Sequence, residues 1–172
     1  MADFKKRRHA REWAVQILFQ IDLNHPSELE PIFAEFWGQQ VACKQEDQAD
    51  ADRSGAIPES LSAEAALNAV APEKLRQFAE RLVRGVFDNR AAIDEKLAFY
   101  TQNWPLHRMG AVDRNVLRLA IYEMFFGGEV PAVVCINEAV DLAKFFSSSE
   151  SGRFVNGILD RAAKDAPRVT RK

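Results

Sequence analysis

The chain has 172 residues, enough for one domain with a sizeable core and barely enough for two very small ones. Its hydrophobic content of 47% and charged content of 28% are typical of an ordinary soluble globular protein. A net charge of −2 excludes a polycation, so any attraction for nucleic acid has to come from local patches of charge.

Helical periodicity runs through the first forty residues. The first predicted helix carries an apolar stripe on one face, made of Ala10, Trp13, Ala14, Ile17, Leu18 and Ile21. A second helix repeats the pattern with Leu29, Ile32, Phe33, Phe36 and Trp37. Residues 38–71 then turn acidic and poor in aromatics, which predicts a mobile acidic insertion or long loop. Within it we expect residues 44–60 to be flexible and dispensable, and a short helix near Ser62–Ala69 is an alternative.

A third helix is predicted from Pro72, a residue that suits the first turn of a helix. Its stripe continues as far as Tyr100, through Leu75, Phe78, Ala79, Leu82, Val83, Val86, Phe87, Ile93 and Leu97. Pro105 interrupts the pattern because it disfavours helix at Trp104. The next helix, about 108–126, is apolar around most of its circumference, as expected of a helix in the middle of a bundle.

The last third of the chain contains two more helices. After a turn at 127–131, residues 132–146 favour a helix, although a strand at Ala132–Ile136 is a rival interpretation. Ser147 and Glu150 have the spacing of a capping box, which predicts the start of the last helix. The whole chain, residues 1–172, is therefore predicted to be an all-α bundle of about six or seven helices in one compact domain.

Motifs of common catalytic and metal sites are absent. The histidines have no metal-ligand spacing, no Gly-rich loop follows a strand, and no base lies near the serines at 147–149. We therefore expect no enzyme, no cofactor and no metal. Cys43 and Cys135 lack a pair spacing, and no apolar run approaches the roughly 20 residues that span a bilayer. A secretory signal is also missing, so a cytoplasmic location without a membrane partner is expected.

Two clusters combine cations with an aromatic residue. On a helical wheel, Arg8, Val15 and Phe19 fall opposite the apolar stripe of the first helix, with Lys5 and Arg11 on its flanks. The last helix places Arg153 and Phe154 one turn after a start that favours anions. Cations bind phosphates and aromatic rings stack unpaired bases, although a frayed basic end and rim core residues would look the same.

Four segments stand out along the chain: RRHAREWAVQILFQ, VDRNVLRLAIYEM, VPAVVCINEAVDLAKFF and RFVNGILDRAA. Taken together, they resemble the NusB family of bacterial transcription antitermination factors, in the order of the family and over roughly two thirds of the chain. The resemblance implies two three-helix subdomains and binding of boxA-type single-stranded RNA with NusE, a ribosomal small-subunit protein. It also implies a role in the RNA polymerase antitermination complex, in read-through of ribosomal RNA operons.

The resemblance also implies which residues contact RNA. These are Arg7, Arg8, Arg11, Phe19, Glu150, Arg153 and Phe154. The run of positive charge itself predicts that Lys5 and Lys6 also contact RNA. The chain departs from the family in its longer, more acidic segment 38–71 and in the glycine of SESGRF, a position where relatives often carry a bulkier residue.

Other residues are interpreted as structural. Glu123 lies on an apolar side and needs a buried polar partner, whereas Arg114 and Arg118 are expected on a solvated helix face. Two other functions stay open: a helical RNA-binding subunit in ribosomal RNA processing or modification, and an adaptor that binds only proteins. The sequence also leaves open whether the protein forms a homodimer.

Overall fold

The structure, a computed structural model, describes residues 2–50, 62–102, 104–128 and 130–167. Over these residues it has no strand, and the all-α prediction is confirmed. The α-helices are α1 (Ala2–Asn24), α2 (Glu30–Asp50), α3 (Ala63–Val70), α4 (Glu73–Asp88), α5 (Arg90–Thr101), α6 (Ala111–Tyr122), α7 (Ala132–Phe146) and α8 (Ser149–Ala162). A 3₁₀ turn at Leu106–Arg108 precedes α6, and a π-helical turn at Glu123–Gly127 extends it.

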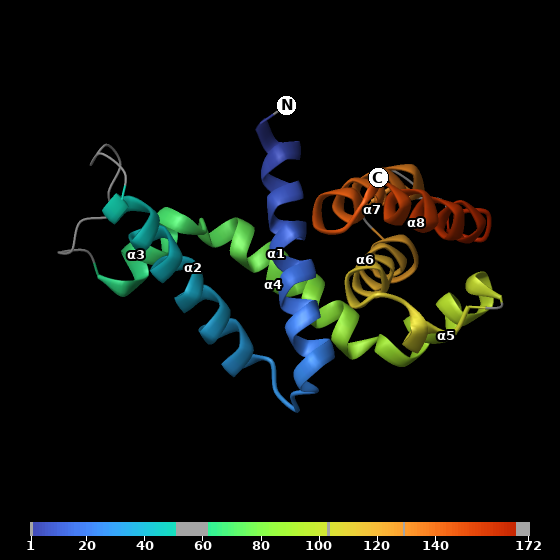
Figure 1. Ribbon diagram of the computed structural model, residues 1–172, viewed down its shortest axis with the longest axis horizontal. Helices are drawn as coiled ribbons and strands as arrows, with labels where there is room; N and C mark the ends of the chain where they lie inside the picture. Colours follow the sequence, from blue (N-terminus) through green and yellow to red (C-terminus); the bar gives the residue numbers. More distant parts are fainter. Residues whose placement is uncertain (1, 51–61, 103, 129, 168–172) are drawn as a thin grey trace.

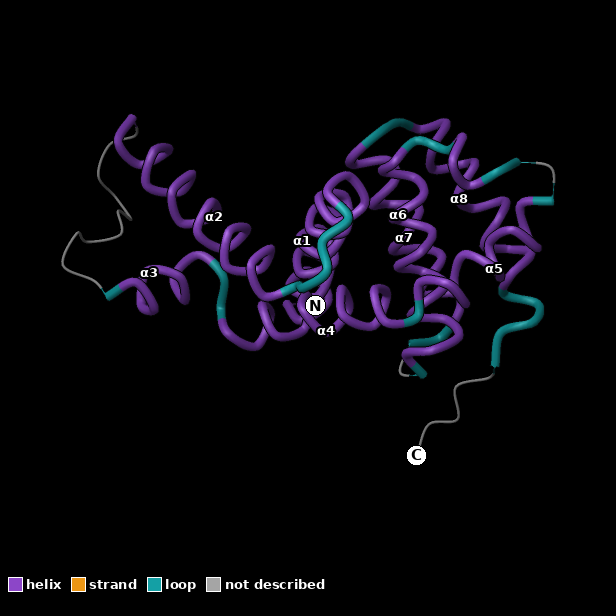
Figure 2. Tube along the Cα trace, turned by 90° about the horizontal axis from the view of Figure 1, so that it is seen from below, coloured by secondary structure: helices purple, strands orange, loops and turns teal. Residues whose placement is uncertain are grey.

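Helix α1 stands between two groups of helices (Figure 1). One group holds α2, α3 and the first half of α4, and the other holds α5 to α8. Figure 2 shows the same arrangement from below, with α2 and α3 at one end of an elongated molecule. Six or seven helices were expected and eight α-helices are described, because short α3 forms and the predicted third helix breaks at Asn89 into α4 and α5.

Helix α6 is the centre of the second group, as its apolar circumference predicted. Every residue from Asn115 to Ile121 is buried. A Cβ built on Gly85 of α4 would lie 2.0 Å from the Cζ of Tyr122 on α6. The side chain of Tyr122 therefore lies across Gly85, and this helix crossing requires a residue without a side chain.

Helix α1 is buried on more of its surface than a single stripe predicts. The expected stripe is buried, but so is Val15, with only 2% of its surface exposed. The prediction that Val15 faces solvent is wrong because helices pack against α1 from both groups. Only a narrow side of α1 is therefore left exposed.

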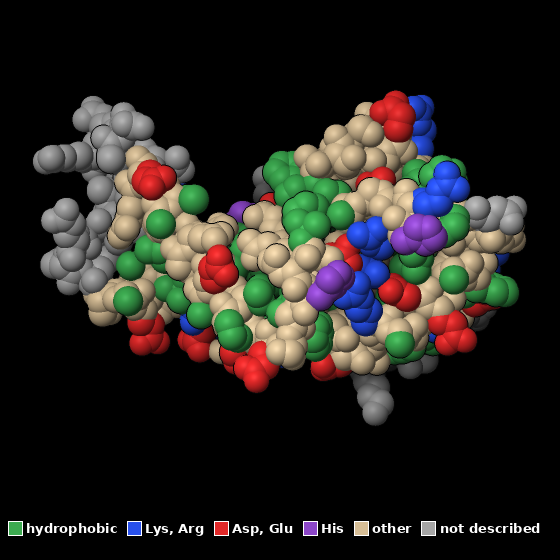
Figure 3. Space-filling model, turned by 60° about the horizontal axis from the view of Figure 1, so that its bottom comes forward, with side chains coloured by type: hydrophobic (Ala, Val, Ile, Leu, Met, Phe, Trp, Pro, Cys, Tyr) green, Lys and Arg blue, Asp and Glu red, His purple; other side chains and the backbone are tan. Residues whose placement is uncertain are grey.

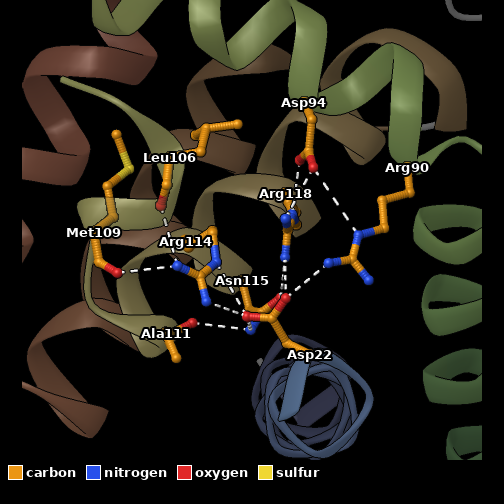
Figure 4. A network of polar contacts seen from close by, with 9 residues as sticks. All are labelled: Asp22, Arg90, Asp94, Leu106, Met109, Ala111, Arg114, Asn115 and Arg118. Atoms are coloured by element: carbon orange, nitrogen blue, oxygen red, sulfur yellow. Dashed lines mark hydrogen bonds and ion pairs between the residues drawn. The ribbon is translucent and has the colours of Figure 1, made fainter. Parts of the chain in front are cut away.

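A buried network of charges joins α1, α5 and α6 (Figure 4). Its centre is Asp22, whose carboxylate accepts hydrogen bonds from Arg90, Arg114, Asn115 and Arg118. Arg118 also donates two hydrogen bonds to Asp94, at 2.7 and 2.9 Å. The predicted solvated face for Arg114 and Arg118 is thus wrong: Arg118 is buried and Arg114 is half-buried. A wheel shows their cationic strip but not the carboxylate of a distant helix that neutralises it.

The segment 38–71 is more ordered at both ends than predicted. Helix α2 continues to Asp50 and α3 forms within Ala63–Val70, where Ser62 caps it by accepting a hydrogen bond from the backbone N–H of Ala65 at 3.3 Å. The loop interpretation is therefore wrong for 38–50, and the short helix is confirmed. Residues 51–61 lie outside the described residues, so the dispensability of 44–60 stays a prediction.

The predicted boundaries in the second half are largely confirmed. Helix α5 ends at Thr101, before Pro105, and residues 132–146 form α7, so the rival strand is wrong. Gly128 adopts a left-handed conformation, with φ 66°, in the turn before α7. The capping residue of α8 is Ser148 rather than Ser147: its hydroxyl accepts a hydrogen bond from the backbone N–H of Ser151 at 3.2 Å.

Candidate functional site

The basic end of α1 contacts α7 through an ion pair between Arg8 and Asp141, and Arg11 lies near Glu138 of the same helix. Lys6 and Arg7 are exposed, whereas Arg8 is half-buried and its Nη1 donates a hydrogen bond to Oδ2 of Asp141 at 2.8 Å. The predicted contact Lys5 lies in α1, but its side chain is outside the described ones. The positive end of α1 is thereby held against the surface of α7, and Asp141 is a neighbour that the sequence pattern did not indicate.

Arg11 is buried, so the prediction of an exposed flank position is wrong. Its Nε and Nη2 donate to the two carboxylate oxygens of Glu123, at 2.9 and 2.7 Å, and only 4% of each residue is exposed. Burial alone would lower the pKa of Arg11, but the hydrogen bonds and charge of Glu123, together with Glu138, raise it overall. The predicted buried partner of Glu123 is thus confirmed, and it is Arg11 itself.

Phe19 is half-buried and lies one turn before Asp22 on α1. It does not belong to the buried core of the described residues, in agreement with its position on the wheel. Because Asp22 is bonded to Arg114 at the start of α6, Phe19 lies near the end of α1 that meets the start of α6.

The start of α8 is tied to the same end of α6. The hydroxyl of Ser151 donates to Oδ2 of Asp113 at 3.1 Å, across the first turns of both helices. Burial raises the pKa of Asp113, although the hydrogen bond from Ser151 opposes the rise. This contact ties the second cluster to the start of α6, and the sequence pattern had not indicated Asp113.

The predicted contacts on α8 are all at the surface or its rim. Glu150 and Arg153 form an exposed ion pair at 2.8 Å, with side chains 74% and 77% exposed. Phe154 is half-buried and packs against the core, as its edge position predicted. An exposed pair contributes little to stability, so the guanidinium of Arg153 can exchange its carboxylate for a phosphate at small cost.

The glycine of SESGRF has a structural reason. A Cβ built on Gly152 would lie 2.7 Å from Cγ of Lys144, whose side chain runs across the start of α8. The aliphatic part of Lys144 therefore occupies the space that a larger residue would fill. This arrangement places another ammonium group, on α7, beside the start of α8.

Charge is mixed over the surface as a whole. On the face shown in Figure 3, basic side chains gather right of centre and acidic ones line the lower edge. Within the described ranges no group of three or more His, Cys, Asp and Glu could hold a metal ion. No described helix is both long and apolar enough to cross a membrane. The cations and half-buried aromatic rings on α1, α7 and the start of α8 are suited to a ligand that carries negative charge and has unstacked aromatic bases.

Comparison with known proteins decides the family. A model of the NusB family matches residues 8–164. The chain belongs to the NusB family. It is 38% identical over 157 residues to the transcription antitermination protein NusB of Pelotomaculum thermopropionicum, covering 90% of this chain and 87% of that protein. It is 36% identical over 166 residues to the protein of the same name from Desulfitobacterium hafniense, covering 96% and 93%.

Solved structures show the same fold. NusB of T. maritima superposes with a TM-score of 0.68 at 34% identity, covering 94% of this chain and 93% of that one. A chain of the complex of antitermination factors NusB and NusE with double-stranded RNA gives a TM-score of 0.66 at 22% identity, covering 94% and 98%. The NusB fold expected from the four sequence segments is confirmed.

Proposed function

We propose that this protein is an RNA-binding transcription antitermination factor that binds boxA-type single-stranded RNA in nascent transcripts together with NusE. In this role it joins the antitermination complex of RNA polymerase and promotes read-through of ribosomal RNA operons. Membership of the NusB family supports the antitermination role. The similar structure of NusB and NusE in complex with RNA supports the two kinds of partner.

One observation carries the proposal: α6 links two clusters of cations and aromatic rings that lie far apart in the sequence. Arg7 and Arg8 lie at the end of α1 that meets the end of α6, where Arg11 binds Glu123. The start of α6 contacts the other end of α1 through Asp22, and it contacts the start of α8, which carries Arg153 and Phe154, through Asp113. A single strand along α1 would meet the cations Arg7 and Arg8 before the ring of Phe19.

The proposed contacts have different tasks. Lys5, Lys6, Arg7, Arg8 and Arg153 would hold phosphates, whose binding releases counterions from the RNA. The half-buried rings of Phe19 and Phe154 would stack unpaired bases, and Glu150 would accept from a base N–H. Arg11 lies beneath this surface, where it holds α1 against α6 and so positions Arg7 and Arg8.

The test is fluorescence anisotropy with a labelled boxA-type strand and a scrambled strand, at several salt concentrations, with and without NusE. Arg7→Gln/Arg8→Gln should lower the salt slope by about 0.7 for each phosphate that the variant no longer binds. A matched control, Arg84→Gln/Arg161→Gln, removes two charges elsewhere: Arg84 pairs with Glu30, and Arg161 bonds to its own helix. An unchanged slope in the first variant contradicts this site, as does an equal reduction of the slope in the control.

The other two functions predict different results in this assay. A subunit for ribosomal RNA processing or modification would bind RNA without preference for the boxA-type strand and without enhancement by NusE. A protein-only adaptor would bind NusE but neither strand at any salt concentration.

A further inference from the structure

Three guanidinium groups surround one aromatic ring between α1 and α4. Phe78 on α4 is half-buried, and the Cζ atoms of Arg7, Arg11 and Arg81 lie 5.7, 5.5 and 5.3 Å from its ring centroid. All three distances are within the range of a cation–π contact. Arg11 is buried and bonded to Glu123, and Arg7 and Arg81 lie at the surface.

A cleft of about 520 Å³ opens beside this ring. Its described lining consists of three cations, one amide and an apolar floor: Arg7, Lys74, Arg81, Gln77, Leu75 and Phe78. No carboxylate lines it within the described part of the chain. A smaller hollow shares Arg7, Phe78 and Arg81 with it, and its lining includes Glu123, a carboxylate that accepts hydrogen bonds from Arg11.

The charge of this cleft favours an anion over any other ligand. Three cations line one concave surface, and low-dielectric walls such as Leu75 and Phe78 strengthen their attraction for an anion. A phosphate bound there would lie beside all three cations, and the apolar floor can contact the adjoining sugar or base. Because Arg7 belongs both to this cleft and to the basic end of α1, the cleft continues the surface proposed for RNA.

We propose that the cleft between α1 and α4 is a phosphate-binding subsite for single-stranded RNA, in which Lys74 and Arg81 join Arg7. This subsite, which rests on the proposed function, carries the strand past the basic end of α1 onto α4. Lys74 and Arg81 are not among the RNA-binding residues implied by the family resemblance. The occupant is the RNA backbone rather than a base, because arginine and lysine hold phosphates without regard to sequence.

The test measures RNA anisotropy for the full-length protein carrying Lys74→Gln/Arg81→Gln, over a range of salt concentrations. The salt slope should fall by about 0.7 to 1.4, which corresponds to one or two fewer phosphates bound on a single strand. The control is Arg84→Gln on the same helix, since Arg84 also stacks on a ring, that of Phe33 at 4.8 Å, but pairs with Glu30. Its slope should equal that of the unsubstituted protein. Circular dichroism and urea unfolding should be unchanged in both variants.

Binding of RNA strands shortened stepwise from each end distinguishes a direct contact in the cleft from a long-range electrostatic effect of Lys74 and Arg81. Once the strand is too short to reach the cleft, the unsubstituted protein and the double variant should bind it equally. A deficit of the double variant that persists at every length overturns the subsite, as does an unchanged salt slope. If the unsubstituted protein binds RNA without using Lys74 and Arg81, and a poly-glutamate peptide binds through these two residues, the subsite is overturned. The cleft then belongs to an acidic protein partner, and the proposed function stands. If the unsubstituted protein binds no RNA, both proposals fail.

Discussion

Replacing Arg11 with alanine distinguishes a structural tie from an RNA contact. In the folded protein Arg11 satisfies both oxygens of Glu123, at 2.9 and 2.7 Å, and its Nη1 lies 3.6 Å from Oε2 of Glu138. The surroundings are apolar enough that the pKa of the nearby Cys135 thiol is raised to about 12, by burial first and by the charge of Glu123 next. The substitution therefore leaves a carboxylate with 4% of its surface exposed without its cation.

The magnitude follows from this burial. Removing one partner of a buried ion pair costs about 3–5 kcal/mol, a large share of the roughly 5–15 kcal/mol that holds a domain folded. For a protein of this size each kcal/mol shifts the thermal midpoint by about 2–4 °C, so a decrease of roughly 6–20 °C is expected. Arg8→Ala is the matched control, because its pair with Asp141 is 36% and 46% exposed and should contribute under about 1 kcal/mol.

The assay combines urea unfolding, followed by circular dichroism, with RNA anisotropy at one fixed salt concentration. The double variant Arg11→Met/Glu123→Leu removes both charges and should recover most of the stability, since apolar residues of similar volume can replace a buried pair. It should also retain the RNA affinity. If Arg11→Ala lowers stability by less than about 1 kcal/mol, or if the double variant is stable but no longer binds RNA, the structural interpretation is refuted.

Two aromatic rings, one buried carboxylate and one glycine give the remaining predictions. Phe19→Ala should lower RNA affinity about tenfold and barely alter urea unfolding. Phe154→Ala should lower the affinity equally, with a modest loss of stability because its ring packs against the core. A stability loss of about 3–5 kcal/mol with intact RNA affinity would identify either residue as a packing residue instead. Burial alone would raise the pKa of Asp22, but Arg114 and Arg118 lower it overall. The contribution of ionised Asp22 to the stability of the folded protein is therefore complete above the ordinary pKa of 3.8, and it is lost as the pH falls through the lower pKa of the folded state. Asp22→Asn should therefore be least stable relative to the unsubstituted protein above pH 3.8, and the difference measured by urea unfolding should shrink in more acidic buffer. Gly85→Ala should cost about 1–3 kcal/mol in urea unfolding because its Cβ would overlap the ring of Tyr122, whereas Gly38→Ala, with no atom within 4 Å of its Cβ, should not destabilise.

The sequence by itself determined the helices and the family. Apolar residues spaced three and four apart indicate which face of a helix is buried, so α1, α6, α7 and α8 could be placed within a few residues, whereas the break between α4 and α5 was missed. The apolar circumference of α6 predicted its central position, and the charge of Glu123 on an apolar side predicted a buried partner. These features depend on local spacing and on the cost of burying a charge.

Only the tertiary structure decided which charged residues are structural. A helical wheel assumes one covered face, but α1 is covered from two sides, and so Val15 and Arg11 are buried despite lying off the stripe. The sequence shows Arg114 and Arg118 as a cationic strip, and only the packing of α1 against α6 brings Asp22 to them. The partner of a charge is set by contacts between residues distant in the chain. Local periodicity carries no information about those contacts, because the same polar residue can face either water or the opposite charge of another helix.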